Sequence, residues 1–392
     1  MYVAAKGGEA AIQASEALFS ALKGKPTREL VTAIQDTLPY LVDRVMGEAS
    51  LYAPELASLA IAQSGGDLYE AVLLLRAYRS TQPRLAYAVP VAPESLLTVR
   101  RISAAFKDIP GGQVLGPSLD YSHRILNTEI LDSEPHPVPE RASHREAPTD
   151  DSGDQAHPPT PSPDGDGAVA ASASYPLVAE WQRRAGLLAA TPEHAPREPA
   201  DIPDVTRDPA LFPAPREHRL QALARADTGG VLALGYASMR GYGLIHPTVN
   251  ELRLAHAEIE VKHPVTGVTF SAGRARVSQA EVVTTGDKTG LSLGFAATLG
   301  WNEVKLIAAA TLDIEMNQSE PHPAHTEEFV MYHTEPVEAS GFCIHFKLPH
   351  YVTFASSLDN LRKVISTFYS SDQDNETSAD RAELEPITQR TP

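Results

Sequence analysis

The sequence has a single cysteine, Cys343, and this scarcity excludes two kinds of small structural scaffold. A lone cysteine forms no disulfide within its chain, and without a Cys-x-x-Cys pair there is no self-contained zinc module. No stretch approaches the ~18 consecutive apolar residues of a membrane-spanning helix. The first residues also lack the basic start and continuous apolar core of a signal peptide. We therefore expect a protein of the reducing cytoplasm with no membrane partner.

Positive charge is also scarce, since 33 Lys and Arg face 50 Asp and Glu and give a formal net charge of -17. A surface that binds the phosphate backbone of nucleic acids needs clustered Lys and Arg, so this balance argues against a nucleic-acid partner. The sequence also lacks the P-loop spacing, the Gly-x-Ser-x-Gly nucleophile elbow and the His-Glu-x-x-His zinc helix. It therefore carries no signature of the P-loop NTPases, the serine hydrolases or the zinc proteases.

Two segments of globular composition lie on either side of a proline-rich middle. Apolar residues recur at helical spacing in the first segment, and we expect residues 1–128 to form a helical domain. Residues 216–370 are expected to form a β-rich α+β domain with packed helices near 302–316 and 356–369. The strands predicted there span residues 230–239, 251–261, 268–285, 328–332 and 342–347. The predicted fold class is α+β, with an N-terminal helical domain followed by a mixed, mainly antiparallel β-rich domain.

The middle of the chain, residues 129–215, is rich in Pro, Asp and Ser and poor in large apolar residues. Such a segment cannot bury enough surface to offset the conformational entropy that is lost when it becomes ordered. We expect a flexible insertion that carries one short helix near residues 177–190. The last residues, 371–392, are polar and acidic and predict a disordered tail.

A glycine-rich loop at residues 108–117 follows three basic residues. Arg100, Arg101 and Lys107 precede Gly111 and Gly112 in the run RRISAAFKDIPGGQVLGP. Backbone amides exposed by glycines, with cations beside them, can hold phosphate groups. The same combination also occurs in an ordinary turn, so both interpretations stay open.

Two other groups of charged residues are candidates for a site. Arg76 and Arg79 lie one helical turn apart and present two guanidiniums on one face, which serves either an anion or a solvated, salt-bridged surface. Asp120, His123 and Arg124 form a possible acid–base cluster, although such groupings are frequent on surfaces.

The run GFCIHFKLPHYVTF at residues 341–354 places His345 and His350 on either side of a Lys-Leu-Pro. If the run begins with a strand, Cys343 and His345 point to the same face, and Pro349 bends the chain so that His350 returns toward His345. Two converging imidazoles can bind a transition metal such as zinc, which needs three or four ligands. Alternatively, one histidine is a hydrogen-bonded core residue and the other lies on a turn.

Several of these stretches together resemble the PhnI family of carbon–phosphorus lyase core-complex subunits. They are MYVAAKGGEAAI, LLLRAYR, RRISAAFKDIPGGQVLGPSLDYSHRIL, RGYG followed by HP, EEFV and the histidine run, in order over residues 1–127 and 218–368. The resemblance implies a cytoplasmic subunit of bacterial phosphonate catabolism, present twice in a two-fold symmetric complex. Its partners would be three other kinds of core subunit, including the iron–sulfur radical subunit. The resemblance lapses in the proline-rich middle and in the acidic tail.

The same resemblance implies an activity in which a phosphonate displaces the purine of MgATP to give a ribose 1-phosphonate 5-triphosphate. The subunit alone would hydrolyse ATP or GTP to the free base, and His345 and His350 would hold an interfacial zinc completed by a partner or a ligand. Cleavage of an N-glycosidic bond requires a carboxylate near C1′, an acid for the purine and cations for the triphosphate. Our candidates are Asp108 and Asp120 as catalytic carboxylates, with Arg76, Arg79, Arg101, Lys107, Gly111 and Gly112 as substrate-binding residues.

Two other functions remain open from the sequence. The chain can be a non-catalytic scaffold that lends His345 and His350 to a neighbour's active site. It can also be a nucleotide-binding regulator that binds ATP without turning it over. Release of purine by the isolated chain would separate an enzyme from both alternatives.

Overall fold

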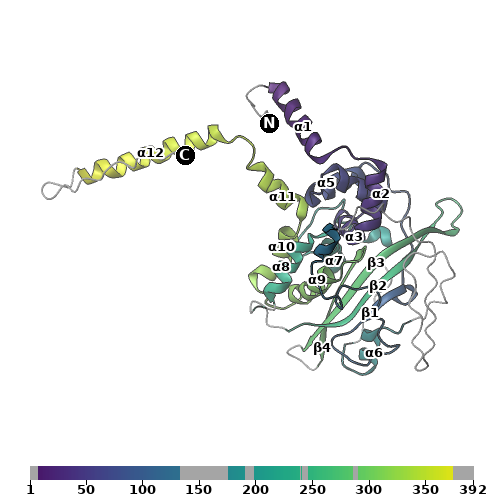
Figure 1. Ribbon diagram of the computed structural model, residues 1–392. Helices are drawn as coiled ribbons and strands as arrows, with labels where there is room; N and C mark the ends of the chain where they lie inside the picture. The colour runs from purple at the N-terminus through teal and green to yellow at the C-terminus, as the bar shows by residue number, and fades with distance from the viewer. Residues whose placement is uncertain are drawn as a thin grey trace. The chain divides into compact units, whose positions relative to one another are not determined.

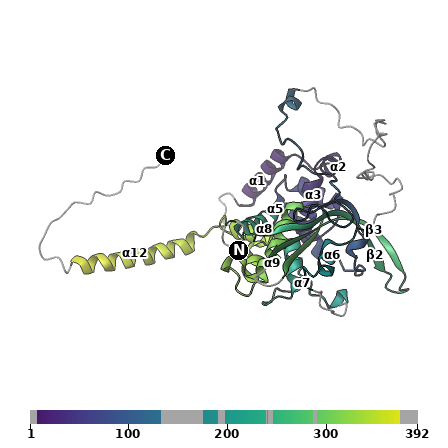
Figure 2. The same cartoon turned by 90° about the horizontal axis from the view of Figure 1, so that it is seen from below.

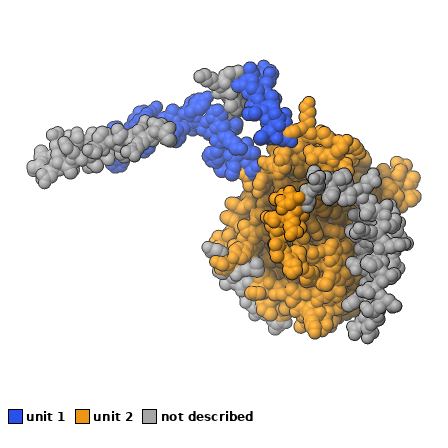
Figure 3. All heavy atoms as spheres, in the orientation of Figure 1, with its two compact units in different colours: residues 1–23, 340–392 blue, residues 24–339 orange. Residues whose placement is uncertain are grey.

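The computed structural model describes residues 8–132, 175–189, 198–238, 240, 246–285 and 290–373 (Figure 1). The chain divides into two compact units, one of residues 1–23 with 340–392 and the other of residues 24–339 (Figure 3). An N-terminal helical region precedes an antiparallel sheet with packed helices, which confirms the predicted α+β class. None of the helices in the described ranges is long and apolar enough to cross a membrane.

The helices of the first part of the chain begin where local chemistry favours a helix start. Thr27 and Asp67 accept hydrogen bonds from backbone N–H groups of the first turns of α2 and α5, which would otherwise lack partners. Pro39 and Pro54 occupy the first positions of α3 and α4, where a proline removes no helical hydrogen bond. These helices are α1 (Gly8–Lys23), α2 (Arg28–Thr37), α3 (Pro39–Ala49), α4 (Pro54–Gln63) and α5 (Leu68–Ser80).

The described strands form one antiparallel sheet in the order β1-β2-β3-β4. They are β1 (Leu97–Ile102), β2 (Thr248–Lys262), β3 (Thr269–Thr285) and β4 (Leu291–Leu299). We predicted β2 and β3 from the sequence, but neither β1 nor β4. β2 and β3 form a long hairpin whose far end extends beyond the helices (Figures 1 and 2).

The sheet buries an apolar set and a polar set of side chains, because successive residues of a strand point to opposite faces. Leu252 and Ala280 belong to the main core together with Leu306 of α9 (Glu303–Met316). Glu251 alternates with Leu252, is fully buried, and accepts a hydrogen bond from Val178 N at the start of α6 (Val178–Arg184). A buried polar face needs partners within the protein, so this second face is built as a network of charges.

Three segments that we predicted as strands are helices. Residues 230–239, 328–332 and 342–347 overlap α8 (Thr228–Ala237), α10 (Glu327–His333) and α11 (Pro336–His345). In α8, Gly235 packs against α9, where an added Cβ would lie 2.8 Å from Ala308 Cβ. The glycine therefore serves a close helix–helix contact. The other helices are α7 (Arg216–Arg225) and α12 (Tyr351–Gln373), with short 3-10 helices at Pro93–Ser95, Thr128–Asp132, Pro199–Asp201 and Pro323–His325.

One carboxylate joins the first helices to the sheet. Asp43 of α3 is buried, accepts a hydrogen bond from Trp301 N and pairs with Arg276 of β3. Gly300 lies against it with φ 79°, and an added Cβ would lie 2.7 Å from Asp43 Cβ. Helices α2 to α5 and the sheet therefore belong to the same compact unit.

The predicted insertion, residues 129–215, is only partly described. Residues 133–174 and 190–197 lie outside the described residues, as do residues 374–392 of the predicted tail. Within the described part, Asp204 pairs with Arg84, and Ala214 N donates to Glu327. This end of the predicted insertion is therefore packed against the rest of its unit, and residues 371–373 belong to α12.

The contact between β4 and α9 predicts the effect of one added methyl group. A Cβ at Gly294 would collide with Ala310 O and lie 2.7 Å from Ile314 Cγ1, so we expect Gly294→Ala to lower the free energy of unfolding by ~1–3 kcal/mol. Gly341→Ala is the matched control, because a Cβ there meets no atom within 4 Å. This helical position should gain ~0.5–1 kcal/mol. Equal urea midpoints for the two variants would contradict the close contact.

Candidate functional site

The two motif histidines converge where α11 ends and α12 begins, in the unit of residues 1–23 and 340–392. The Nε2 atoms of His345 and His350 lie 3.0 Å apart, and their ring centroids are 4.6 Å apart. Two nitrogen ligands of one tetrahedral zinc, each ~2.0–2.1 Å from the metal, would be about 3.3 Å apart. The observed separation therefore suits two ligands of a single ion.

The orientation of His350 is fixed by its other ring nitrogen. His350 Nδ1 lies 2.6 Å from Leu348 O, and donation to this carbonyl places the proton on Nδ1 and leaves the Nε2 lone pair free for a metal. Both histidines are exposed. The residues that the structure describes contain no cluster of three His, Cys, Asp or Glu able to hold a metal ion. The pair thus supplies two exposed ligands, and a complete site would need others from elsewhere.

The expectation that Cys343 shares a face with His345 is wrong, because this segment is helical. Two residues along an α-helix are separated by about 200° around the axis, so Cys343 of α11 points away from the side that carries His345. The thiol is free and exposed. The convergence of the histidines comes instead from the helix end and the turn before α12, which contains Pro349.

Arg101 lies inside the protein and holds the glycine-rich loop. Its side chain is 0% exposed; Nε donates to Glu251 Oε1 at 2.5 Å, and one terminal nitrogen donates to the carbonyls of Pro110 and Gly112 at 2.9 and 2.6 Å. The other terminal nitrogen donates to a further backbone carbonyl at 2.8 Å. Gly111 and Gly112 have φ of 82° and 75°, the left-handed region that glycine tolerates best. Arg101 therefore shapes the loop.

The carboxylates that we selected from the sequence lie in different surroundings. Asp108 and Lys107 are exposed on the loop. Asp120 is half-exposed and accepts hydrogen bonds from Arg100 at 2.6 Å and from Arg124 at 3.2 Å. Arg100 in turn donates to Glu303 of α9. Asp120 is thus part of an ion-pair network that anchors the end of the loop.

Several buried polar residues beneath α6 complete this region. Arg253 pairs with Glu251, and Asn250 Nδ2 donates to Glu281 at 3.0 Å. Burial raises the pKa of Glu281 to about 7; the charge of Glu251 adds to this effect and the hydrogen bond from Asn250 opposes it. The network holds the polar face of the sheet together and has a pH-sensitive member.

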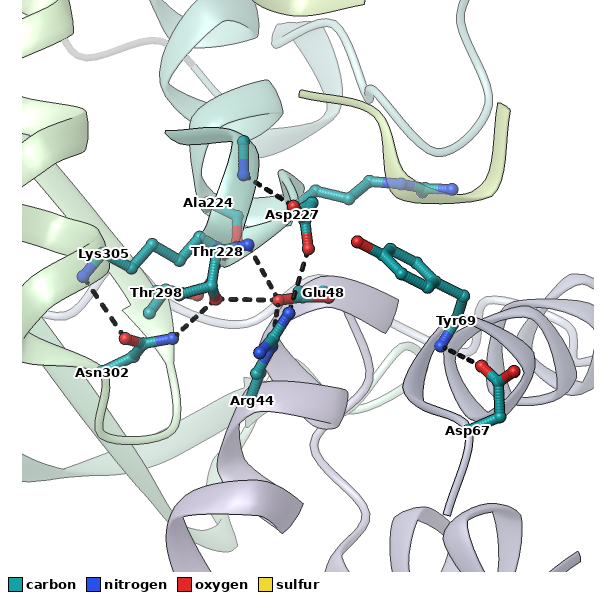
Figure 4. Close-up of polar contacts among 12 residues, drawn as sticks. Arg44, Glu48, Asp67, Tyr69, Ala224, Asp227, Thr228, Thr298, Asn302 and Lys305 are labelled. Atoms are coloured by element: carbon teal, nitrogen blue, oxygen red, sulfur yellow. Dashed lines mark hydrogen bonds and ion pairs between the residues drawn. The ribbon is translucent and has the colours of Figure 1, made fainter. Parts of the chain in front are cut away.

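A second buried network, which the sequence analysis missed, joins α3 to α8 (Figure 4). Glu48 is 1% exposed, and its Oε1 accepts from Arg44 Nε at 2.9 Å and from Thr228 N and Oγ1 at 3.0 and 2.8 Å. Arg44 also donates to Asp227, the residue that caps α8. The only signal in the sequence is the spacing of Arg44 and Glu48 on one helix face.

Lys305 reaches the same region from α9 (Figure 4). Its Nζ donates to Ala224 O at 2.6 Å. Burial lowers the pKa of Lys305 to about 8, while Glu48 and Asp227 act in the opposite direction. None of the described cavities is lined by Lys305 or Glu48, so this network fits a structural role.

Arg76 and Arg79 differ in their partners. Arg76 donates to the carbonyl of Glu48 at 3.0 and 2.7 Å, to Glu335 and to the carbonyl of Arg225. These contacts fix α5 against α3 and α7. Among the described residues, no hydrogen bond is recorded for the Arg79 guanidinium. Arg76 is therefore held by the protein, whereas Arg79 retains free donors.

Comparison with known proteins shows the family. The family described as "Bacterial phosphonate metabolism protein (PhnI)" matches residues 1–367, and the chain belongs to it. The resemblance found in the sequence is thus confirmed.

Three curated relatives share nearly the whole length. A putative C-P lyase subunit protein HtxH of Stutzerimonas stutzeri is 41% identical, covering 100% of this chain and 99% of that protein. The two others are each named alpha-D-ribose 1-methylphosphonate 5-triphosphate synthase subunit PhnI. The one from Rhizobium meliloti (strain 1021) is 37% identical over 93% of this chain and 95% of its own. The one from Escherichia coli (strain K12) is 38% identical over 93% and 98%.

The buried carboxyl of Glu281 predicts a pH dependence. Because its folded pKa of about 7 lies above the ordinary value of 4.5, its contribution to stability is full below pH 4.5 and is lost as the pH rises through 7. Glu281→Gln keeps an acceptor for Asn250 and removes the titration. We expect the variant to gain roughly 2–3 kcal/mol of unfolding free energy relative to the parent between pH 5 and 8.

Urea unfolding at several pH values measures this gain. Glu260→Gln is the control, because it makes the same change at an exposed position of β2. Parallel pH profiles for the parent and the Glu281 variant would show that Glu281 ionises normally in the folded protein.

Proposed function

We propose that this chain acts in a complex that converts MgATP and an alkylphosphonate to a ribose 1-phosphonate 5-triphosphate and free purine. A phosphonate oxygen forms the new bond to C1′, the C1′–N9 bond breaks, and the purine leaves with the bonding electrons and takes up a proton. Membership of the PhnI family and the names of two relatives support the reaction. The structural observation behind it is the converging pair His345 and His350, which is exposed and incomplete, as a site shared between subunits would be.

The partners in this proposal are the other core subunits of the carbon–phosphorus lyase complex, including the iron–sulfur radical subunit, with two copies of each chain. We propose that His345 and His350 supply two ligands of an interfacial zinc and that the radical subunit or a bound ligand completes the coordination. Mg²⁺ enters with ATP as part of the substrate. Alone, the chain would act as a nucleosidase on ATP or GTP, with water in place of the phosphonate.

Within this chain, the proposed catalytic groups come from the glycine-rich loop and its surroundings. Asp108 and Asp120 are the candidate carboxylates near C1′, and Lys107 is an exposed cation beside the amides of Gly111 and Gly112. Because Arg101 already donates to the loop carbonyls, we assign it a positioning role for this loop rather than direct contact with the substrate.

One observation favours a second candidate, a scaffold that donates metal ligands to its neighbour. Asp120 is already engaged by Arg100 and Arg124, and both Asp108 and Asp120 are exposed. An exposed carboxylate does not by itself exclude water from a reacting glycosidic bond.

Release of free base tests the enzymatic function. We expect chromatography to show adenine from MgATP with the purified chain alone, and more adenine when methylphosphonate and the other core subunits are added. The scaffold alternative predicts no adenine from the chain alone. Absence of adenine from the fully assembled mixture would overturn the proposed reaction itself.

The metal content of the assembled complex tests the histidine pair. We expect His345→Ala and His350→Ala each to lose most of the bound zinc, because a site left with one ligand from this chain binds weakly. His123→Ala is the control, since His123 is exposed in the other compact unit. Elemental analysis measures the zinc, and size-exclusion chromatography confirms assembly. Full zinc content in the double histidine variant would remove these residues from the metal site.

A further inference from the structure

A cavity of about 220 Å³ lies in the unit of residues 24–339, and neither the histidine pair nor the glycine-rich loop lines it. Its walls come from α7, from α10 and the start of α11, and from the segment around residues 205–210. The side chains that decide its chemistry are Arg225, His218 and Glu335, with exposed Asp208 and Glu338 on its lining.

Arg225 is a partly buried cation with too few partners. Its side chain is 18% exposed, and its nearest carboxylate oxygen, Glu335 Oε2, lies 4.0 Å from Nε. No hydrogen bond joins its guanidinium to a described residue, although a guanidinium carries five donors. The Glu335 carboxylate is also the ion-pair partner of Arg76. Two guanidiniums therefore share one carboxylate at the wall of this cavity.

Other arginines add to the positive charge around Arg225. Burial, and after it repulsion from Arg76, lowers the pKa of Arg225 to about 10, and Arg79 acts in the same direction. Burial also lowers the pKa of Arg79. The charge of Asp204 opposes this effect, and the charge of Arg84 adds to it. Asp204 already pairs with Arg84. The nearby carboxylates are thus engaged, and cationic charge remains uncompensated inside the protein.

A second observation comes from a histidine on the same cavity. His218 is only 2% exposed, and its Nε2 has no hydrogen-bond partner among the described residues. An unsatisfied buried polar group costs about 1–3 kcal/mol, and an acceptor oxygen beside it would remove that cost. With the ring proton on Nε2, His218 lacks the same kind of partner as Arg225, an oxygen acceptor.

The carboxylates of Asp208 and Glu338 repel anions from the cavity. Both residues are exposed and line the cavity, so they weaken its attraction for anions in general. An anion gains from this site only if it reaches Arg225 itself. The volume is below the ~300 Å³ at which pockets begin to enclose drug-sized ligands, so a single tetrahedral oxyanion group fits better than a whole nucleotide.

We propose that this cavity binds the terminal phosphoryl or phosphonyl group of a substrate, with Arg225 and His218 as the contacting donors and with Arg76 and Arg79 supplying positive charge. The choice of these ligands rests on the proposed function, whereas the presence of an oxyanion site rests on the cavity alone. The phosphoryl end of a nucleoside triphosphate and a small alkylphosphonate share this chemistry.

Calorimetric titration of the assembled complex, which contains the full chain, with each ligand in turn distinguishes the two possibilities. Inorganic tripolyphosphate represents the nucleotide end and methylphosphonate represents the acceptor. We expect at least one of them to bind, and Arg225→Gln to weaken that binding about tenfold or more, because a charge-assisted hydrogen bond is lost. Arg274→Gln is the matched control, since Arg274 pairs with Glu258 on the exposed hairpin.

A second variant keeps the test valid if the Arg225 variant fails to fold. Glu338→Gln removes an exposed carboxylate from the cavity lining and should tighten binding severalfold. Unchanged affinity in both the Arg225 and Glu338 variants, or no binding of either ligand, would overturn the site. Binding that depends on Arg225, in a complex that releases no adenine, would support the oxyanion site while the proposed reaction fails.

Discussion

The buried carboxylate of Glu48 is the interaction on which the arrangement of the helices depends. Its side chain accepts hydrogen bonds from Arg44 and Thr228 (Figure 4). Its backbone carbonyl accepts a hydrogen bond from Arg76. One residue thereby ties α3 to α5 and to the start of α8. Removal of such a carboxylate leaves the cations around it without compensation, which costs more than a surface ion pair contributes. The geometry around Arg225 follows, because Arg76 reaches Glu335 and the Arg225 carbonyl from this anchor.

The sheet has a comparable centre in Glu251, which binds Arg101 and Arg253 on adjacent strands. Both centres follow the same physical rule: buried charges are retained where they are paired and hydrogen-bonded. Arg225 and His218 depart from that rule, and the two motif histidines are exposed, with their Nε2 atoms 3.0 Å apart as each other's partner among the described residues. The residues of the candidate sites lack some of their hydrogen-bond or ion-pair partners. The buried residues that hold the fold together, such as Glu48 and Glu251, have theirs.

The sequence predicted the elements whose signals are local. The helix expected near residues 302–316 matches α9 (Glu303–Met316), and the strands expected at residues 251–261 and 268–285 fall within β2 and β3 almost completely. Segments such as α8, which we predicted as a strand, depend on tertiary contacts, and there a glycine serves close packing against α9. The histidine pair was predicted from Pro349 and spacing, although its convergence arises from a helix end. No local pattern marks Arg225, since its surroundings come from helices more than a hundred residues apart.

β1 ties the first part of the chain to β2, a strand that lies far away in the sequence. Arg101 and Glu251 are 150 residues apart in the sequence, yet they lie on neighbouring strands of one sheet. Because the entropy cost of closing a loop grows only slowly with its length, changes of length in the parts of the intervening segment outside α6, α7 and α8 cost little stability. β1 and β2, at the two ends of this segment, must both be present because they pair with each other. A fragment that stops before β2 would bury Arg101 without its counter-charge, and a fragment that begins at β2 would expose the hydrogen-bonding edge that β1 covers. The part of the chain up to β1 and the part from β2 onward therefore depend on each other for stability. The protein cannot be divided between β1 and β2 into two independent domains.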